Sequence, residues 1–415
     1  MKRGTRALLI GAGVAALAAP GVTQQAAAPI ARYTMDVTTV SGLAAMGGGL
    51  GGGLSMAFGG GGNRVAHQME LRLGSTRAAT GSPAADHFLP SGAKMGKSVP
   101  LVSPTPSTPV RERKDNDVPE NFQKPKGRLL IFWGCGAHAG PGQPVVIDFA
   151  KVAAGQMPPN VFGAGVAIPR EWSVSASTSK TYGEWPNARD RKLLSGNSSI
   201  LGDHRVVGNY SPDIAFSLTQ DFMGPLNPTA SGATTIQLNW SSVPAATGYY
   251  AWVMGFQPGD DGQPRDMVWW ASSASRNFGG ALWDWLSPAT VQRLIGQKIV
   301  MPPSQTSCLV PQEVKAAIPQ GMMIGNMYAY GPEANFAYPP RPADPKTAWK
   351  PEWTTRVRYR SNAMWFVNGP PGLSGGMGGG AQASGSSQSQ EAPRKKCKGG
   401  FGGLLGAVVT GGAAC

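Results

Sequence analysis

The chain has 415 residues, including 58 glycines and 36 prolines, and only 14% of its residues are charged. This composition excludes a coiled coil or a helical bundle, because such proteins carry many Glu and Lys residues on their surfaces. The net charge of +14 lies in the flanks, whereas residues 129–300 are neutral. A nucleic-acid binder usually carries a basic stripe on its folded body, so we expect no nucleic-acid partner.

The N-terminal segment 1–28 predicts a secretory signal peptide. Lys2, Arg3 and Arg6 precede an apolar run from Ala7 to Ala19, and small residues follow. This order is typical of export signals, and the run is too short for a comfortable membrane span. We therefore expect cleavage between residues 18 and 30 and a mature protein without a transmembrane span. Its expected location is the periplasm, the outer-membrane surface or the extracellular space.

Residues 29–75 predict a β-hairpin with a long tip. Segments 32–41 and 65–73 alternate apolar and polar residues, as strands do. The tip, residues 46–63, consists almost entirely of glycine and apolar residues. Such a tip is either a flexible insertion without a function of its own or a segment that contacts a membrane or a partner. Residues 76–127 are rich in Pro and Ser and are expected to form a linker.

From residue 128 onward, short strands are separated by turn residues and a single helix signal. Ser287 and Pro288 predict the start of that helix, and Val291, Leu294 and Ile295 share one face. The pattern predicts a mostly β protein with one or two β-sandwich domains, residues 128–227 and 228–370, and Gly/Pro-rich disordered ends. The C-terminal disordered part is residues 371–415. The expected strands are 128–133, 143–149, 172–177, 204–210, 213–218, 234–240, 249–254, 266–271, 326–330 and 353–367.

Residues 234–254 carry a more specific pattern. An alternating strand ends at Trp240, a loop with a proline and Ala-Thr-Gly follows, and Tyr249 opens the next strand. The arrangement resembles a fibronectin type III module over about residues 228–340. The resemblance implies that Trp240 is a buried core residue and that Tyr249, Ala251 and Val253 face inward. The chain as a whole resembles exported bacterial envelope proteins.

The four cysteines are Cys135, Cys308, Cys397 and Cys415. They lie too far apart in sequence to resemble the closely spaced thiolates of zinc or iron–sulfur sites. An even number in an exported chain predicts disulfides. We expect Cys135 to pair with Cys308 and Cys397 with Cys415, although four cysteines allow three pairings.

Cys135 and His138 are the one pair that resembles a nucleophile and its base. The sequence offers no orienting acid for them, so the disulfide is the preferred interpretation of Cys135. His87 and His204 each follow an Asp, but neither pair has an identifiable third metal ligand. We therefore expect no catalytic residue, no cofactor and no metal site.

Two features are candidates for binding. Arg356, Arg358 and Arg360 alternate with apolar or neutral residues, which places all three on one face of a strand. The row is either a solvated edge that discourages strand-to-strand aggregation or a patch that binds anions. Trp269 and Trp270 must face opposite sides of a strand, so Trp270 is a candidate for stacking on a ligand.

Together these features predict an exported, non-enzymatic cell-envelope protein with a structural or adhesive binding role. Its expected partner is an anionic envelope surface or polysaccharide, because the excess positive charge lies in the flanks and fits an anionic surface of no particular pattern. The alternatives are a carbohydrate-binding protein, or an envelope hydrolase that uses Cys135 and His138. The sequence predicts no oligomeric state.

Overall fold

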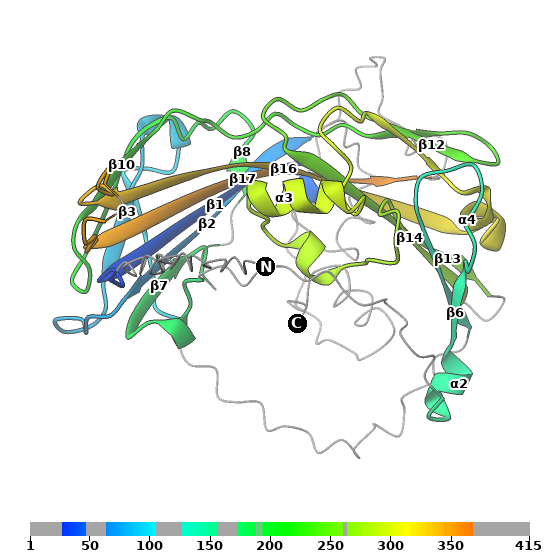
Figure 1. The fold of residues 1–415 in the computed structure, drawn as a ribbon, viewed down its shortest axis with the longest axis horizontal. Helices are drawn as coiled ribbons and strands as arrows, with labels where there is room; N and C mark the ends of the chain where they lie inside the picture. The colour runs from blue at the N-terminus through cyan, green and yellow to red at the C-terminus, as the bar shows by residue number, and fades with distance from the viewer. Residues whose placement is uncertain are drawn as a thin grey trace, which may run out of the picture.

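The computed structural model describes residues 27–46, 64–104, 127–156, 173–187, 190, 193–259, 264–344 and 346–367. Within them the protein is mostly β, as expected, and its strands form one ten-stranded sheet and two smaller sheets. Figure 1 shows the long strands of the large sheet lying side by side, with β3 and β10 near one end and β12 near the other. The expected signal peptide up to residue 26, the hairpin tip from residue 47 to 63 and the tail from residue 368 lie outside the described residues.

The large sheet mixes antiparallel and parallel pairs. β1 pairs in parallel with β17 and β14 with β5, and β1 and β2 form the expected antiparallel hairpin. In spatial order the strands are β6 (Val145–Asp148), β5 (Arg128–Trp133), β14 (Pro264–Ala271), β13 (Gly248–Pro258), β16 (Met322–Tyr338), β17 (Trp353–Phe366), β1 (Ala31–Gly42), β2 (Val65–Ser75) and β7 (Thr181–Trp185), and β8 (Leu194–Ser195) also pairs with β2.

The N-terminal hairpin is not a separate unit, in contrast to the division expected from the sequence. It lies between β17 and β7, so residues 29–75 share one sheet with strands from both expected sandwich domains. The physical reason is burial on both sides of β1: Tyr33 and Met35 are inaccessible on one side, and Thr34 and Asp36 are buried on the other. A strand buried on both faces belongs inside a sheet.

The two smaller sheets form a second layer against one face of the large sheet. One has the order β10 (Ile214–Leu218), β9 (Gly202–Gly208), β3 (Ala85–Phe88) and β4 (Ser98–Pro100), and the other has the order β11 (Thr229–Ser231), β12 (Ile236–Asn239) and β15 (Ser307–Val310). Phe216 of β10 contacts the rings of Tyr33 and Phe336 at centroid distances of 6.2 and 5.2 Å. The apolar core lies between these layers.

Two expectations about local structure were wrong. Part of the expected linker, residues 76–127, is structured: β3, β4 and the 3-10 helix η2 (Ser91–Ala93) lie there, and Leu89, Val99 and Leu101 are buried. These elements are only three or four positions long, too short to show a period in the sequence. The expected strand 172–177 gives way, in its described part, to the 3-10 helix η3 (Ala176–Thr178).

Trp240 is a core residue, as expected, with 5% of its surface exposed. Its ring lies 5.6 Å from that of Tyr249, and the Tyr249 hydroxyl accepts a hydrogen bond from the Val243 N–H. Ala251 and Val253 are also inaccessible. The strands before and after this corner, β12 and β13, belong to different sheets, so the corner joins the two layers.

The other face of the large sheet is covered in part by α3 (Pro288–Gly296). Ser287 caps this helix by accepting a hydrogen bond from the Thr290 N–H, as the sequence predicted. Val291 packs on Tyr250 and Trp252 in a second apolar cluster. Gly248 permits the close approach, because a Cβ there would lie 2.8 Å from the Val291 side chain.

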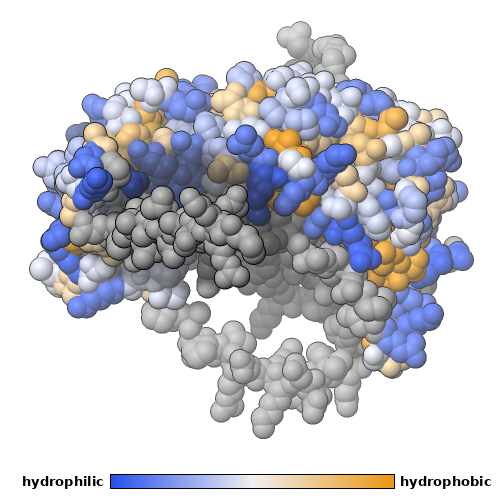
Figure 2. All heavy atoms as spheres, viewed as in Figure 1, coloured by the Kyte–Doolittle hydropathy of each residue, from blue (hydrophilic) through white to orange (hydrophobic). Residues whose placement is uncertain are grey.

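A small apolar cluster and four further helices complete the described part of the fold. Near β6, apolar residues gather around Ile131 and Ile147, and Figure 2 shows a hydrophobic patch at that side of the molecule. The remaining helices are α2 (Phe149–Ala153), α4 (Gln312–Ala317), η1 (Leu43–Met46) and η4 (Gly280–Trp283). No described helix has the length and apolar character needed to cross a membrane.

A buried chain of hydrogen bonds joins the two layers. The Tyr33 hydroxyl lies 2.7 Å from His87 Nδ1, His87 Nε2 lies 2.9 Å from His204 Nδ1, and His204 Nε2 lies 2.8 Å from the Ile200 carbonyl oxygen. The carbonyl can only accept, so His204 Nε2 donates to it, and Tyr33 then donates at the far end with both imidazoles neutral. Burial lowers the pKa of both histidines, that of His87 strongly.

Candidate functional site: a charged face of the large sheet

The three arginines of β17 share one face, as the sequence predicted. Arg356, Arg358 and Arg360 pair in register with Thr34, Asp36 and Thr38 of β1, whereas Val357 and Tyr359 enter the core on the other side. The edge interpretation was wrong, because β17 lies between β16 and β1 inside the sheet. The row therefore has no role in protecting a sheet edge.

Carboxylates from neighbouring strands accompany the arginines. We define the charged face as the surface that β7, β2, β1, β17 and β16 form on the side of the sheet to which Thr34, Asp36 and Thr38 belong, at the level of these three residues. Its ionisable members are Glu184 on β7, Glu70 and Arg72 on β2, Asp36 on β1, Arg356, Arg358 and Arg360 on β17, and Glu333 on β16.

A β-bulge places one of these carboxylates. The register between β16 and β17 shifts between Tyr330 and Glu333, so Glu333 lies opposite Arg358 where a regular ladder would place Pro332. Proline lacks an N–H and is tolerated at such an irregularity. The bulge thus gives Arg358 acidic residues opposite it on both neighbouring strands, Asp36 and Glu333.

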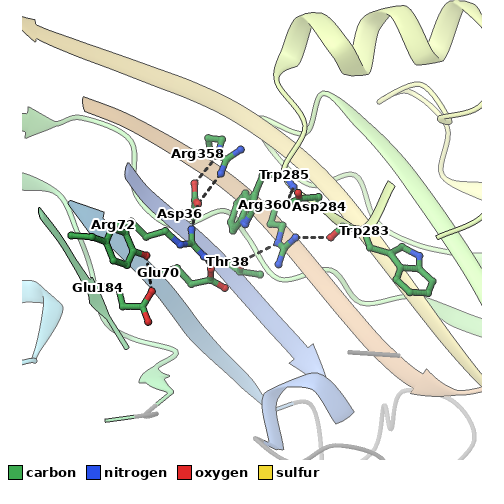
Figure 3. A network of polar contacts seen from close by, with 11 residues as sticks. Asp36, Thr38, Glu70, Arg72, Glu184, Trp283, Asp284, Trp285, Arg358 and Arg360 are labelled. Carbon is green, nitrogen blue, oxygen red and sulfur yellow. Dashed lines mark hydrogen bonds and ion pairs between the residues drawn. The ribbon is translucent and has the colours of Figure 1, made fainter. Parts of the chain in front are cut away.

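Asp36 is the centre of the face. Its side chain is inaccessible, and it accepts two hydrogen bonds from Arg358, at 2.6 Å from Nε and 2.8 Å from Nη2. Arg72 Nη1 donates to the same carboxylate at 3.0 Å. Figure 3 shows the two guanidinium groups approaching Asp36 from opposite sides. Such paired, planar contacts hold all three side chains in fixed positions.

The network continues toward β7 and becomes more accessible. Arg72 also binds Glu70, and the two side chains are 31% and 40% exposed. Burial alone lowers the pKa of Arg72, but the neighbouring carboxylates of Glu70 and Asp36 raise it overall. The Tyr182 hydroxyl donates to Glu184 at 2.6 Å. This part of the face offers carboxylates and a guanidinium to the solvent in a fixed arrangement.

Arg360 differs from Arg358 in the partners of its guanidinium group. Its Nε donates to the Thr38 hydroxyl at 3.1 Å and its Nη1 to the Trp283 carbonyl at 3.0 Å, and both acceptors are neutral. The Arg360 guanidinium carbon lies 4.1 Å from the ring centroid of Trp285, a cation–π contact. Trp285 and Arg360 are both half-buried. Figure 3 shows this indole beside the arginine row.

The structure separates the other residues singled out from the sequence. Trp270 is inaccessible, and its indole N–H donates to the Gly134 carbonyl at 2.8 Å, so it is a core residue and cannot stack on a ligand. Cys135 is bonded to Cys308, which confirms that pairing. Cys397 and Cys415 lie outside the described residues.

Cys135 and His138 do not form a nucleophile–base pair. A sulfur held in a disulfide cannot supply a thiolate. His138 Nδ1 instead lies 3.1 Å from Glu313 Oε1 at an exposed position. Among the residues that the structure describes, no group of three His, Cys, Asp or Glu side chains could hold a metal ion.

Sequence reasoning missed Asp36, Glu70, Arg72, Glu184 and Glu333 as members of the site. One signal was available, because Glu70 and Arg72 are two positions apart in an alternating strand and therefore point to the same side of it. What the sequence could not show is that β1 pairs with β17, which lies near the opposite end of the described chain. Comparison of the chain with protein-family models and with curated proteins finds no match.

Proposed function

We propose that this protein is an exported, non-enzymatic component of the cell envelope with a structural or adhesive binding role, and that the charged face is its binding surface. The observation that carries the proposal is the fixed network around Asp36, whose outer members Glu70 and Arg72 are accessible to solvent. Charged side chains that are held rigidly and left partly exposed are typical of a recognition surface.

Export is supported by two independent features. The N-terminal segment 1–28 has the order of a signal peptide. The Cys135–Cys308 disulfide joins the loop after β5 to β15, and such bonds persist in oxidising compartments. We expect cell fractionation to find the protein outside the cytoplasm, with a mature N-terminus between residues 18 and 30. A cytosolic protein that retains Met1 would contradict this part of the proposal.

The binding role is tested with isolated cell envelopes and the purified mature protein. We expect sedimentation with envelopes, and we expect the Glu70→Gln and Trp285→Ala variants to bind more weakly. Arg205→Gln is the matched control, because this arginine lies on β9 in the other layer and makes an exposed ion pair with Asp213. Failure of the unaltered protein to sediment with envelopes would refute the proposed role.

The hydrolase alternative loses its support, since Cys135 has no free thiol in the folded protein. The carbohydrate-binding alternative gains support from the charged face, because its accessible carboxylate and guanidinium groups can bind sugar hydroxyls.

A further inference from the structure

We infer that the ligand of the charged face is an uncharged polysaccharide, and this inference rests on the proposed binding function. Its starting point is the charge balance of the described residues. Level with Thr34 to Thr38, four carboxylates face four guanidiniums: Asp36, Glu70, Glu184 and Glu333 against Arg72, Arg356, Arg358 and Arg360.

The balance persists one step outward. Arg32 lies one row further along β1, level with Gly74 and Thr354, and adds a positive charge. Asp284 lies beside Trp285 and adds a negative one. Attraction of an acidic polymer or an anionic lipid surface requires a net positive field. Equal numbers of charges of both signs, held this close together, largely cancel beyond a short distance, so this surface does not supply such a field.

The same groups suit sugar hydroxyls. Adjacent hydroxyls of a pyranose each donate and accept, and a planar carboxylate or guanidinium can bind two of them at once. Glu70 and Arg72 are the accessible pair of this kind, with 40% and 31% exposure. Because Asp36 and Glu70 already hold Arg72 in place, little conformational entropy is lost when a ligand binds there.

An aromatic surface completes the site. Trp285 is half-buried, and the Arg360 guanidinium lies over its ring. Arg358 lies 5.5 Å from the same ring centroid, so two guanidiniums orient the indole, and the residue remains partly exposed. An indole supplies the apolar surface needed for packing against the C–H face of a sugar ring. Trp285 and the Glu70–Arg72 pair lie on opposite sides of Asp36 in Figure 3. A chain of several sugar units, rather than a single monosaccharide, is therefore the fitting occupant.

The experiment measures binding of the purified mature protein to a panel of neutral polysaccharides: dextran, mannan, a soluble β-glucan and chitin oligosaccharides. Polygalacturonate and vesicles with anionic phospholipid are tested in parallel. Each affinity is measured at roughly 50 and 300 mM NaCl, because screening weakens attraction between exposed charges. We expect at least one neutral polymer to bind, with an affinity that changes less than about twofold over this range.

Variants connect that binding to the charged face. Glu70→Gln and Trp285→Ala should each weaken binding of the neutral polymer by about tenfold, the usual effect of losing a charge-assisted contact or an aromatic contact. Trp285→Phe should restore much of the loss, and Arg205→Gln should change nothing. Since the chain carries a net charge of +14, its basic flanks can hold acidic polymers nonspecifically, and these variants should leave such binding unaltered.

Two results would overturn the inference. One is that the protein binds isolated envelopes but none of the neutral polysaccharides, a result that would leave the proposed function standing. The other is that Glu70→Gln and Trp285→Ala weaken only the salt-sensitive binding of polygalacturonate or anionic vesicles. If neither envelopes nor any polysaccharide bind, the proposed function itself fails.

Discussion

Asp36→Asn tests whether the network of the charged face stabilises the fold. The substitution keeps the shape of the side chain but removes the charge that two guanidiniums share. Asp36 is inaccessible, and Arg358 is only 13% exposed, so Arg358 would lose its bidentate partner in a poorly hydrated position. Leaving one member of a buried ion pair without its partner typically costs about 3–5 kcal/mol.

The expected magnitude lies at the lower end of that range. Arg72 is 31% exposed and retains Glu70, and Glu333 lies opposite Arg358 across β16 and β17. We therefore expect the free energy of unfolding to fall by about 3 kcal/mol, which for a protein of this size corresponds to a Tm lower by about 5 °C.

The assay is urea and thermal unfolding of the purified mature protein. The matched control is Asp213→Asn, which breaks the Arg205–Asp213 ion pair, whose side chains are 59% and 54% exposed. Exposed pairs contribute about 0–1 kcal/mol, so the control should unfold almost like the unaltered protein. If the two variants lose the same small amount of stability, Asp36 is not an essential anchor of the sheet and the reasoning is refuted.

Three further predictions concern the layer interface. Burial lowers the pKa of His87, so below about pH 6.5 the unfolded state binds more protons than the folded state, and stability should fall as the pH drops through that value. In a profile of Tm against pH, His87→Gln should flatten this part of the curve. His138→Gln, which changes an exposed histidine, is the control and should not flatten it. Cys135→Ser removes a link between residues 173 positions apart and should lower the free energy of unfolding by on the order of 5 kcal/mol in the chain-entropy model. The loss is measured by unfolding without reductant. An unchanged unfolding midpoint, or a peptide map of the unaltered protein without the Cys135–Cys308 link, would contradict the assignment. Trp240→Ala should cost about 3–5 kcal/mol because the ring is buried between the layers, and an unchanged Tm would count against its position in the core.

The sequence by itself determined the local features of this protein. Period-two alternation identified most of the long strands, and the capping residue Ser287 located α3. The same alternation placed the arginines of β17 on one face, because side-chain direction depends only on the strand's own backbone. Trp240 was identified as a core residue from the short pattern over 234–254, within which the contacts with Tyr249 and Val243 form.

Only the tertiary structure decided what those local features mean. β1 and β17 come from opposite ends of the described chain and yet pair with each other. The alternation within a strand does not show which other strand it pairs with. That pairing brings Asp36 to Arg358, moves the arginine row from an expected edge to the interior of a sheet, and balances its charge. The pairing of β14 with β5 likewise places Trp270 beside a strand that is far away in sequence. Trp270 is buried there, so it is a core residue and not a ligand-binding one. Side-chain direction is a property of the strand, whereas burial and charge balance are properties of the whole sheet.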